Sequence, residues 1–121
     1  MLAQAGRRPD PSHDRAPGPL AARIQWLVEQ RLTQPIRNAE LARTVGMGLR
    51  TLEERYRRES GEPLHRTIVR LRLERAMRLL SEGREPVKRI AGLSGFRDPA
   101  YFIRAFKAAF GVTPGEIRRT A

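Results

Sequence analysis

One sequence pattern occurs twice in this chain of 121 residues, and the two copies constrain the fold more than any other feature. The first copy reads Leu-Ala, three other residues and Gly-Met at positions 41–47, and the second reads Ile-Ala, three other residues and Gly-Phe at 90–96. The small alanine suits a close helix crossing, and the glycine that follows can end a helix in the left-handed conformation. The repeat distance of about 50 residues predicts two copies of one helical unit.

The residues that follow each glycine extend the match and supply a second helix. Apolar side chains recur one helical turn apart in both copies, at Leu52 and Tyr56 and at Phe102 and Phe106, which places each pair on one helix face. Asp98 precedes a proline, which is typical of a helix start because aspartate caps and proline needs no hydrogen-bond acceptor there. A helix, a glycine turn and a second helix form a helix-turn-helix, whose second helix can enter a DNA major groove.

The fold class predicted from these patterns is all-α, with about seven helices forming two helix-turn-helix subdomains joined by a long linker helix. Periodicity and stop signals divide the chain into a first unit at residues 20–62, a linker helix at 63–82 and a second unit at 84–120. Residues 20–121 together form the tandem domain. Residues 1–19 are rich in proline and poor in large apolar side chains, so they are predicted to be a disordered leader or linker.

Several expectations concern single side chains. The first helix is predicted over Leu20–Leu32, with Trp26 packed beside its apolar stripe. Asn38 is predicted to cap the next helix through its side chain, and Thr113 to cap the last one. Arg72 lies among apolar residues of the linker helix, so a structural ion pair is favoured over a DNA contact.

The charge balance favours a polyanionic partner. The chain has 24 Lys and Arg residues against 13 Asp and Glu residues, a formal net charge of +11, and arginine binds phosphates and guanine edges through paired hydrogen bonds. Nucleic acid is favoured over an anionic membrane surface, and an Arg-rich coding bias without a binding role is the other alternative. The sequence has neither an apolar run long enough to span a bilayer nor a signal-peptide core, so the protein is expected to be cytoplasmic.

A set of outward-facing residues is predicted to contact DNA. They face away from the apolar side of the two second helices, or lie near a helix start, where free backbone N–H groups also favour phosphate. For each of them, a solvated side chain without a DNA contact is the alternative. The set is Leu49, Arg50, Glu53, Glu54, Arg57, Lys88, Arg97, Pro99, Ala100, Ile103, Arg104 and Lys107.

These residue types suit different parts of a duplex. Arg50 and Arg104 are the candidates for guanine edges, whereas Ile103 suits a thymine methyl group. Arg97 and Lys107 are expected to bind phosphates. The second helices are therefore predicted to read bases, with the surrounding cations holding the backbone.

Two acidic residues, Glu53 and Glu54, stand among the predicted contacts of the first unit. A glutamate can accept a hydrogen bond from cytosine, yet it repels nearby phosphates. Two interpretations stay open: one of these carboxylates reads cytosine, or it orients Arg50 or Arg57 through an ion pair. Orientation is favoured for at least one of the two.

The length of the linker helix suggests how the two units bind together. A helix of roughly 18 residues is about 27 Å long, and packed ends could separate the two second helices by about one turn of B-DNA, near 34 Å. Both could then enter successive major grooves on one face of the duplex. One chain would in this way recognise a site that need not be palindromic.

Residues from about Leu20 to Arg119 resemble the DNA-binding domain of AraC-type (AraC/XylS) bacterial transcription regulators. The resemblance rests on four stretches: the second copy of the repeat at 90–96, the aromatic pattern at 101–106, Phe-Gly-Val-Thr-Pro at 110–114, and Arg-Leu-Glu-Arg-Ala followed by Leu-Leu at 72–80. These motifs cover most of the chain and are specific to the family.

The resemblance implies a transcription regulator that binds double-stranded DNA sequence-specifically and contacts RNA polymerase. In the family, base contacts come from the positions of Arg50, Glu53 and Glu54, where at least one acidic position is more usually Gln or Arg. The run at 47–52 is similar to the branch with an N-terminal amidase-like (DJ-1/PfpI-type) sensor domain. The isolated domain is then expected to be monomeric, and the whole protein to dimerise through that sensor. A fragment and a free-standing protein beginning at Met1 are both open.

Other classes of function find less support in the sequence. There is no cysteine, and the His, Ser and acidic residues form neither a nucleophile with its base nor a metal-ligand pattern, so no enzyme activity, catalytic residue, metal or cofactor is predicted. A helical protein-interaction module that docks on RNA polymerase or another regulator is the alternative, which the two glutamates of the first unit keep open.

Overall fold

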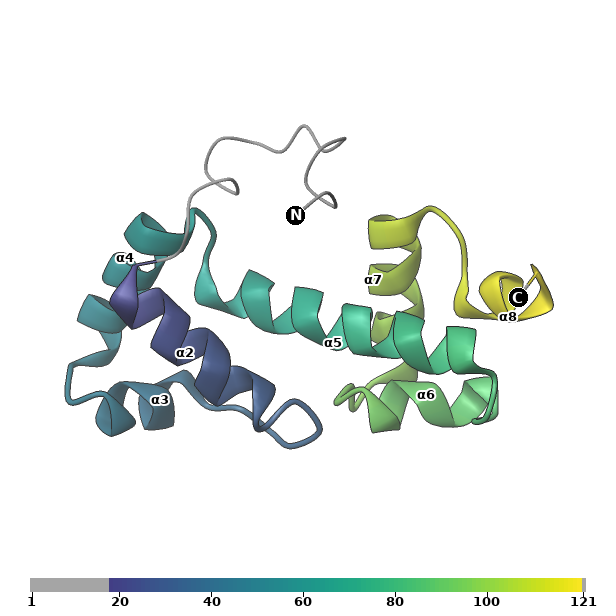
Figure 1. Ribbon diagram of the computed structural model, residues 1–121, viewed down its shortest axis with the longest axis horizontal. Helices are drawn as coiled ribbons and strands as arrows, with labels where there is room; N and C mark the ends of the chain where they lie inside the picture. The colour runs from purple at the N-terminus through teal and green to yellow at the C-terminus, as the bar shows by residue number, and fades with distance from the viewer. Residues whose placement is uncertain (1–17, 121) are drawn as a thin grey trace.

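A computed structural model describes residues 18–120, and residues 1–17 of the predicted leader lie outside that range (Figure 1). Residues 18–120 contain seven α-helices and no strand, which confirms the predicted all-α fold. The first helix begins at Pro19, the last residue of that leader. The helices are α2 (Pro19–Glu29), α3 (Asn38–Thr44), α4 (Leu49–Ser60), α5 (Leu64–Glu82), α6 (Val87–Leu93), α7 (Pro99–Phe110) and α8 (Pro114–Thr120).

The long helix α5 connects two groups of three helices (Figure 1). Helices α2, α3 and α4 surround its N-terminal end, and α6, α7 and α8 surround its C-terminal half. The second helices of the two units, α4 and α7, both stand across α5 and run in the same direction, each starting near its shorter partner α3 or α6. The repeated sequence pattern therefore corresponds to a repeated arrangement in space.

Each unit has its own hydrophobic core, and α5 contributes to both. Its N-terminal half gives Leu64 and Ile68 to the core formed by α2, α3 and α4. Its C-terminal half gives Leu73, Ala76 and Leu80 to the core formed by α6, α7 and α8. The apolar surface of α5 is broad because the N-terminal half of the helix packs on one unit and the C-terminal half packs on the other, each through a different face.

The two turns match at the level of single hydrogen bonds. Gly46 has φ 75° and Gly95 has φ 95°, the left-handed conformation that the repeat predicts. The residue after each glycine donates its N–H to the alanine of its copy: Met47 to the Ala42 carbonyl oxygen at 3.0 Å, and the corresponding bond in the second copy at 2.9 Å. Both helix ends adopt the same six-residue closure, which is the Schellman arrangement.

Two caps in the second unit follow the sequence prediction. The Asp98 carboxylate accepts the Ala100 N–H at 3.0 Å, at the start of α7. At the start of α8, the Thr113 hydroxyl accepts the Glu116 N–H at 3.2 Å, and the Glu116 carboxylate accepts the Thr113 N–H at 2.8 Å. These hydrogen bonds to Thr113 lower the pKa of Glu116. The pair is a capping box that fixes where α8 begins.

Three single-residue predictions for the first unit are wrong. Helix α2 ends at Glu29, before Leu32. The Trp26 side chain is 58% exposed, because its position lies on the opposite side of α2 from the buried Ile24 and Val28. Asn38 is the first residue of α3 and makes no cap; its amide instead donates to Glu53 at 3.4 Å.

The predicted ion pair of Arg72 is also replaced by a different interaction. Its Nε donates to the Leu32 carbonyl oxygen at 3.0 Å, and its Nη2 donates to the Gln34 carbonyl oxygen at 2.8 Å. Both acceptors belong to the segment that joins α2 to α3. The guanidinium therefore donates hydrogen bonds to backbone carbonyl groups just beyond the C-terminal end of α2, and the carboxylate partner that the sequence predicted is not used.

A buried chain of polar groups fixes α4 against α2 and α5. The Tyr56 hydroxyl accepts from Gln25 at 3.0 Å and lies 2.8 Å from the Thr67 hydroxyl. Thr67 donates to Glu62 at 2.5 Å, and Arg70 donates to the same carboxylate oxygen at 2.7 Å. Because hydrogen bonds are directional, this chain sets the rotation of α4 about its axis and so decides which side chains it exposes.

Replacing Thr67 with valine is expected to lower the free energy of unfolding by about 2 kcal/mol. The valine has the same shape, but Tyr56 loses its acceptor and the Glu62 carboxylate loses one donor inside the core. Urea denaturation followed by circular dichroism measures the change. Thr44→Val is the control, because the exposed Thr44 hydroxyl only donates to the Glu40 carbonyl oxygen of its own helix. Equal effects of the two substitutions would contradict the structural role of this chain of buried polar groups.

Candidate DNA interface

The outer face of α4 carries the predicted contacts of the first unit. Leu52 and Tyr56 are fully buried on the inner face. Glycine in the left-handed conformation at Gly46 ends α3 and allows α4 to start at an angle to it. All five predicted contacts on α4 are exposed, namely Leu49, Arg50, Glu53, Glu54 and Arg57.

The outer face of α7 carries the predicted contacts of the second unit. Phe102 and Phe106 anchor the inner face; their ring centroids are 5.8 Å apart, and Phe96 packs on Phe102 at 5.0 Å. These tilted and edge-to-face ring contacts hold α7 at its N-terminal and middle turns. All five predicted contacts on α7 are exposed, namely Pro99, Ala100, Ile103, Arg104 and Lys107.

Two further predicted contacts lie outside the second helices. Lys88 is exposed in the first turn of α6, and Arg97 is exposed in the turn that joins α6 to α7. Both therefore belong to the second helix-turn-helix unit. Every residue of the predicted set is therefore on the surface, and the set falls into two groups, one at each unit.

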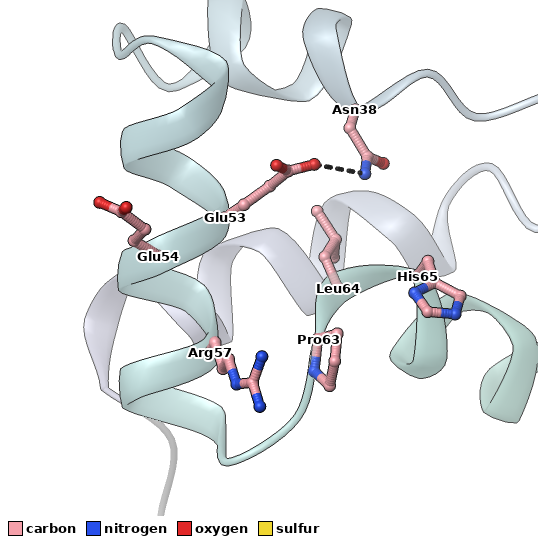
Figure 2. A pocket seen from close by; sticks show the side chains of 7 residues that line it. All are labelled: Asn38, Glu53, Glu54, Arg57, Pro63, Leu64 and His65. Atoms are coloured by element: carbon pink, nitrogen blue, oxygen red, sulfur yellow. Dashed lines mark hydrogen bonds between the residues drawn. The ribbon is translucent and has the colours of Figure 1, made fainter.

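The two acidic residues on the outer face of α4, Glu53 and Glu54, point to different sides of the helix (Figure 2). Glu54 forms an ion pair with Arg50, with Oε2 3.3 Å from Nε. Glu53 instead accepts the Asn38 amide of α3 across the turn. The ion pair expected for one of these carboxylates is present, and the other carboxylate ties the two helices of the unit together.

A hollow opens between α4 and the starts of α3 and α5 (Figure 2). Arg57 of α4 and His65 of α5 both border it beside Pro63. Sequence reasoning missed Asn38 and His65 as neighbours of the predicted contacts, because they approach α4 from separate segments. Their spacing along the chain carries no local signal of that approach.

The two outer faces differ in charge. On α7 the charged residues are Arg104 and Lys107, both exposed, and this helix contains no acidic residue. On α4 the outer face carries Glu53 and Glu54 between Arg50 and Arg57. The α7 face therefore presents unopposed positive charge to a phosphate backbone, whereas α4 presents a mixed face on which Arg50 is already paired.

Two copies of a helix-turn-helix held by one helix, each with an exposed second helix, define a tandem helix-turn-helix DNA-binding domain. Residues 41–120 match the family described as "Helix-turn-helix domain". The chain belongs to the AraC-type family of helix-turn-helix transcription regulators. Within residues 18–120, no helix is both long and apolar enough to cross a bilayer.

Similar proteins cover nearly the whole described range. The HTH-type transcriptional regulator GlxA of Rhizobium meliloti (strain 1021) is 35% identical over 92 residues, which are 76% of this chain and 28% of GlxA. The chain thus spans less than a third of this relative's length.

Two solved structures show the same fold. The C-terminal domain of AraT, a response regulator from Geobacillus stearothermophilus, is 26% identical with a TM-score of 0.80, and the match covers 88% of this chain and 89% of that domain. The DNA-binding domain of AdpA, described as a global transcriptional factor in complex with a target DNA, is 29% identical with a TM-score of 0.76. That match covers 84% of this chain and 91% of the AdpA chain.

Proposed function

We propose that this domain binds double-stranded DNA sequence-specifically, as the DNA-binding part of a transcription regulator, with α4 and α7 in successive major grooves. One observation carries the proposal: two equivalent helices, α4 and α7, expose their outer faces while sharing one continuous helix, α5. The 19 residues of α5 correspond to about 28 Å. With the packed ends added, this length suits two helices one turn of B-DNA apart, about 34 Å.

The residue types on the two faces suggest separate tasks. Arg104 is assigned to a guanine edge and Ile103, with Ala100, to thymine methyl groups. Lys107 and Arg97 are assigned to phosphates, as is Lys88 at the start of α6. In the first unit Arg50 reads a base while Glu54 restricts its conformations. The AdpA domain, with its target DNA, supports this use of the fold.

The decisive experiment is selection from a randomised double-stranded DNA library, followed by fluorescence anisotropy on the enriched sequence. The domain is expected to enrich one asymmetric site of about 15–20 base pairs, because two helices about one turn apart span that length. Affinity is expected to fall steeply as salt rises, since phosphate contacts release counterions. The proposal is wrong if no sequence is enriched and scrambled duplexes bind equally well at low salt.

Replacing Glu54 with glutamine is expected to raise affinity for unrelated DNA about three-fold, because one charge that repels phosphates is lost. It is also expected to reduce discrimination at the base pair that Arg50 reads by about five-fold, since the guanidinium loses its restraint. Anisotropy with the selected site and with single-base variants measures both effects. Glu74→Gln is the control, because Glu74 pairs with Arg70 in the same spacing but on α5. Unchanged discrimination would show that Glu54 does not position Arg50.

A further inference from the structure

Within residues 18–120, the two units also meet at a point away from their packing on α5. The main helix–helix contacts all lie within a unit or involve α5, and none joins α2, α3 or α4 to α6, α7 or α8. The additional contact lies between the segment after α2 and the turn at Gly95. There Arg72 of α5 donates to the carbonyl oxygens of Leu32 and Gln34.

Gly95 lies directly against this arginine-carbonyl pair. A methyl group built on its Cα would overlap the Leu32 carbonyl oxygen and would stand 2.6 Å from Nε of Arg72. The equivalent glycine of the first copy, Gly46, has a similar positive φ of 75°, yet a methyl group there would meet nothing within 4 Å. The turn at Gly95 therefore contacts the other unit, whereas the equivalent turn at Gly46 does not.

This contact is narrow, and it is held by directional bonds. An open cleft of about 360 Å³ lies beside it, lined from the first unit by Pro35 and Ile36 and from the second by Phe96 and Tyr101. Burial lowers the pKa of Arg72, and the charge of Arg97 lowers it further. Within residues 18–120 Arg72 has no carboxylate partner, so its position depends on the two carbonyls. Units that share a small interface move relative to each other unless such a contact restrains them.

We propose that the joint formed by Arg72, Leu32 and Gly95 fixes the relative placement of α4 and α7, and thereby sets the one half-site spacing that the domain accepts. In the joint, the Leu32 carbonyl oxygen accepts the Arg72 Nε–H, and the bare Cα of the Gly95 turn packs directly against both groups. Arg72 is in this sense a positioning residue that contacts no base. The effect on half-site spacing rests on the proposed function, whereas the effect on the relative placement of α4 and α7 does not.

A pair of matched variants separates the joint from general stability. Arg72→Ala removes the clamp, and Arg75→Ala is its control, because Arg75 donates to the Leu93 carbonyl oxygen at 2.8 Å on the side of the second unit. Gly95→Ala forces the joint open, and Gly46→Ala is its control, because it carries the same backbone strain without the contact. Circular dichroism and thermal melting identify the variants that are folded at the temperature of measurement.

Spin labels report the joint without DNA. The chain has no cysteine, so Arg58→Cys on α4 and Ala109→Cys on α7, both exposed, introduce the two labelling sites. Pulsed electron paramagnetic resonance is expected to show a distance distribution about two-fold wider for Arg72→Ala and Gly95→Ala than for the parent. The Arg75→Ala and Gly46→Ala distributions are expected to match the parent. A distribution as narrow in Arg72→Ala as in the parent overturns the proposal.

Selected DNA then tests the spacing consequence. One base pair inserted between the half-sites rotates the second groove by about 34° and is expected to weaken wild-type binding about 30-fold. For Arg72→Ala the same insertion is expected to cost about five-fold, while Arg75→Ala keeps the wild-type ratio. An unchanged ratio in Arg72→Ala contradicts the spacing role. If the wild-type domain selects no sequence at all, the proposed function is wrong. The spin-label distances still test whether the joint fixes the relative placement of α4 and α7.

Discussion

Replacing Phe106 with alanine is expected to lower the free energy of unfolding by about 3–5 kcal/mol. The side chain is fully buried, and its ring lies between Phe102, at 5.8 Å, and Phe110, at 4.6 Å between centroids. Its removal leaves a cavity at the middle of the second core, which the two aromatic neighbours cannot fill without leaving their rotamers. Chemical denaturation followed by circular dichroism measures the loss.

Ile103→Ala on the same helix is the control for this substitution. Ile103 is 46% exposed, so the change is expected to cost less than about 1 kcal/mol in stability. It removes a proposed thymine contact, so DNA affinity falls while the fold persists. A cost below about 1 kcal/mol for Phe106→Ala would contradict the packing described for the second core.

Replacing Arg50 and Arg104 together with glutamate is expected to weaken binding to the selected site at least about 100-fold, because two proposed base contacts become repulsive carboxylates near phosphates. Both side chains are exposed, so the fold is expected to be retained. Anisotropy at fixed salt measures the loss. Arg23→Glu with Arg78→Glu makes the same change of net charge at exposed positions on α2 and α5, and is expected to cost about ten-fold less.

The same pair of variants separates DNA recognition from the alternative of a protein-interaction module. A module that docks on a protein without reading DNA would lose no more affinity for DNA in the Arg50 and Arg104 variant than in the control. The mixed charge of α4, with Glu53 and Glu54 on its outer face, is the feature that favours this alternative. Equal losses in the two double variants would therefore favour docking and would remove the proposed base contacts.

Much of the fold could be predicted because its determinants are local. The glycines at 46 and 95, the Asp98 cap and the capping box at Thr113 each act within one helical turn. Each of the weaker helix and turn patterns occurs in both copies of the repeat, so the two copies support the same prediction. The exposed outer faces followed from the apolar positions opposite them, so the candidate contacts on α4 and α7 could be placed on the surface from periodicity alone.

The end of α2 and the Asn38 cap were local errors, whereas the errors at Trp26 and Arg72 concern packing and hydrogen bonds between separate segments. Trp26 is exposed because α2 turns only one side to the core and Trp26 lies on the opposite side. Arg72 meets backbone carbonyls from a segment about 40 positions away along the chain, a distance over which periodicity carries no signal. The chain of polar groups from Tyr56 through Thr67 to Glu62 was equally hidden, because hydrogen-bond partners in a core depend on the tertiary fold.

The separation of the two cores has a consequence for how such a protein changes over evolutionary time. In a symmetric dimer one substitution in the recognition helix alters both halves of the operator at once, and the DNA must acquire two changes to follow it. Here α4 and α7 are encoded separately and rest on different buried side chains. Each half of the binding site can therefore drift on its own, by single steps that leave the other half's recognition and folding intact.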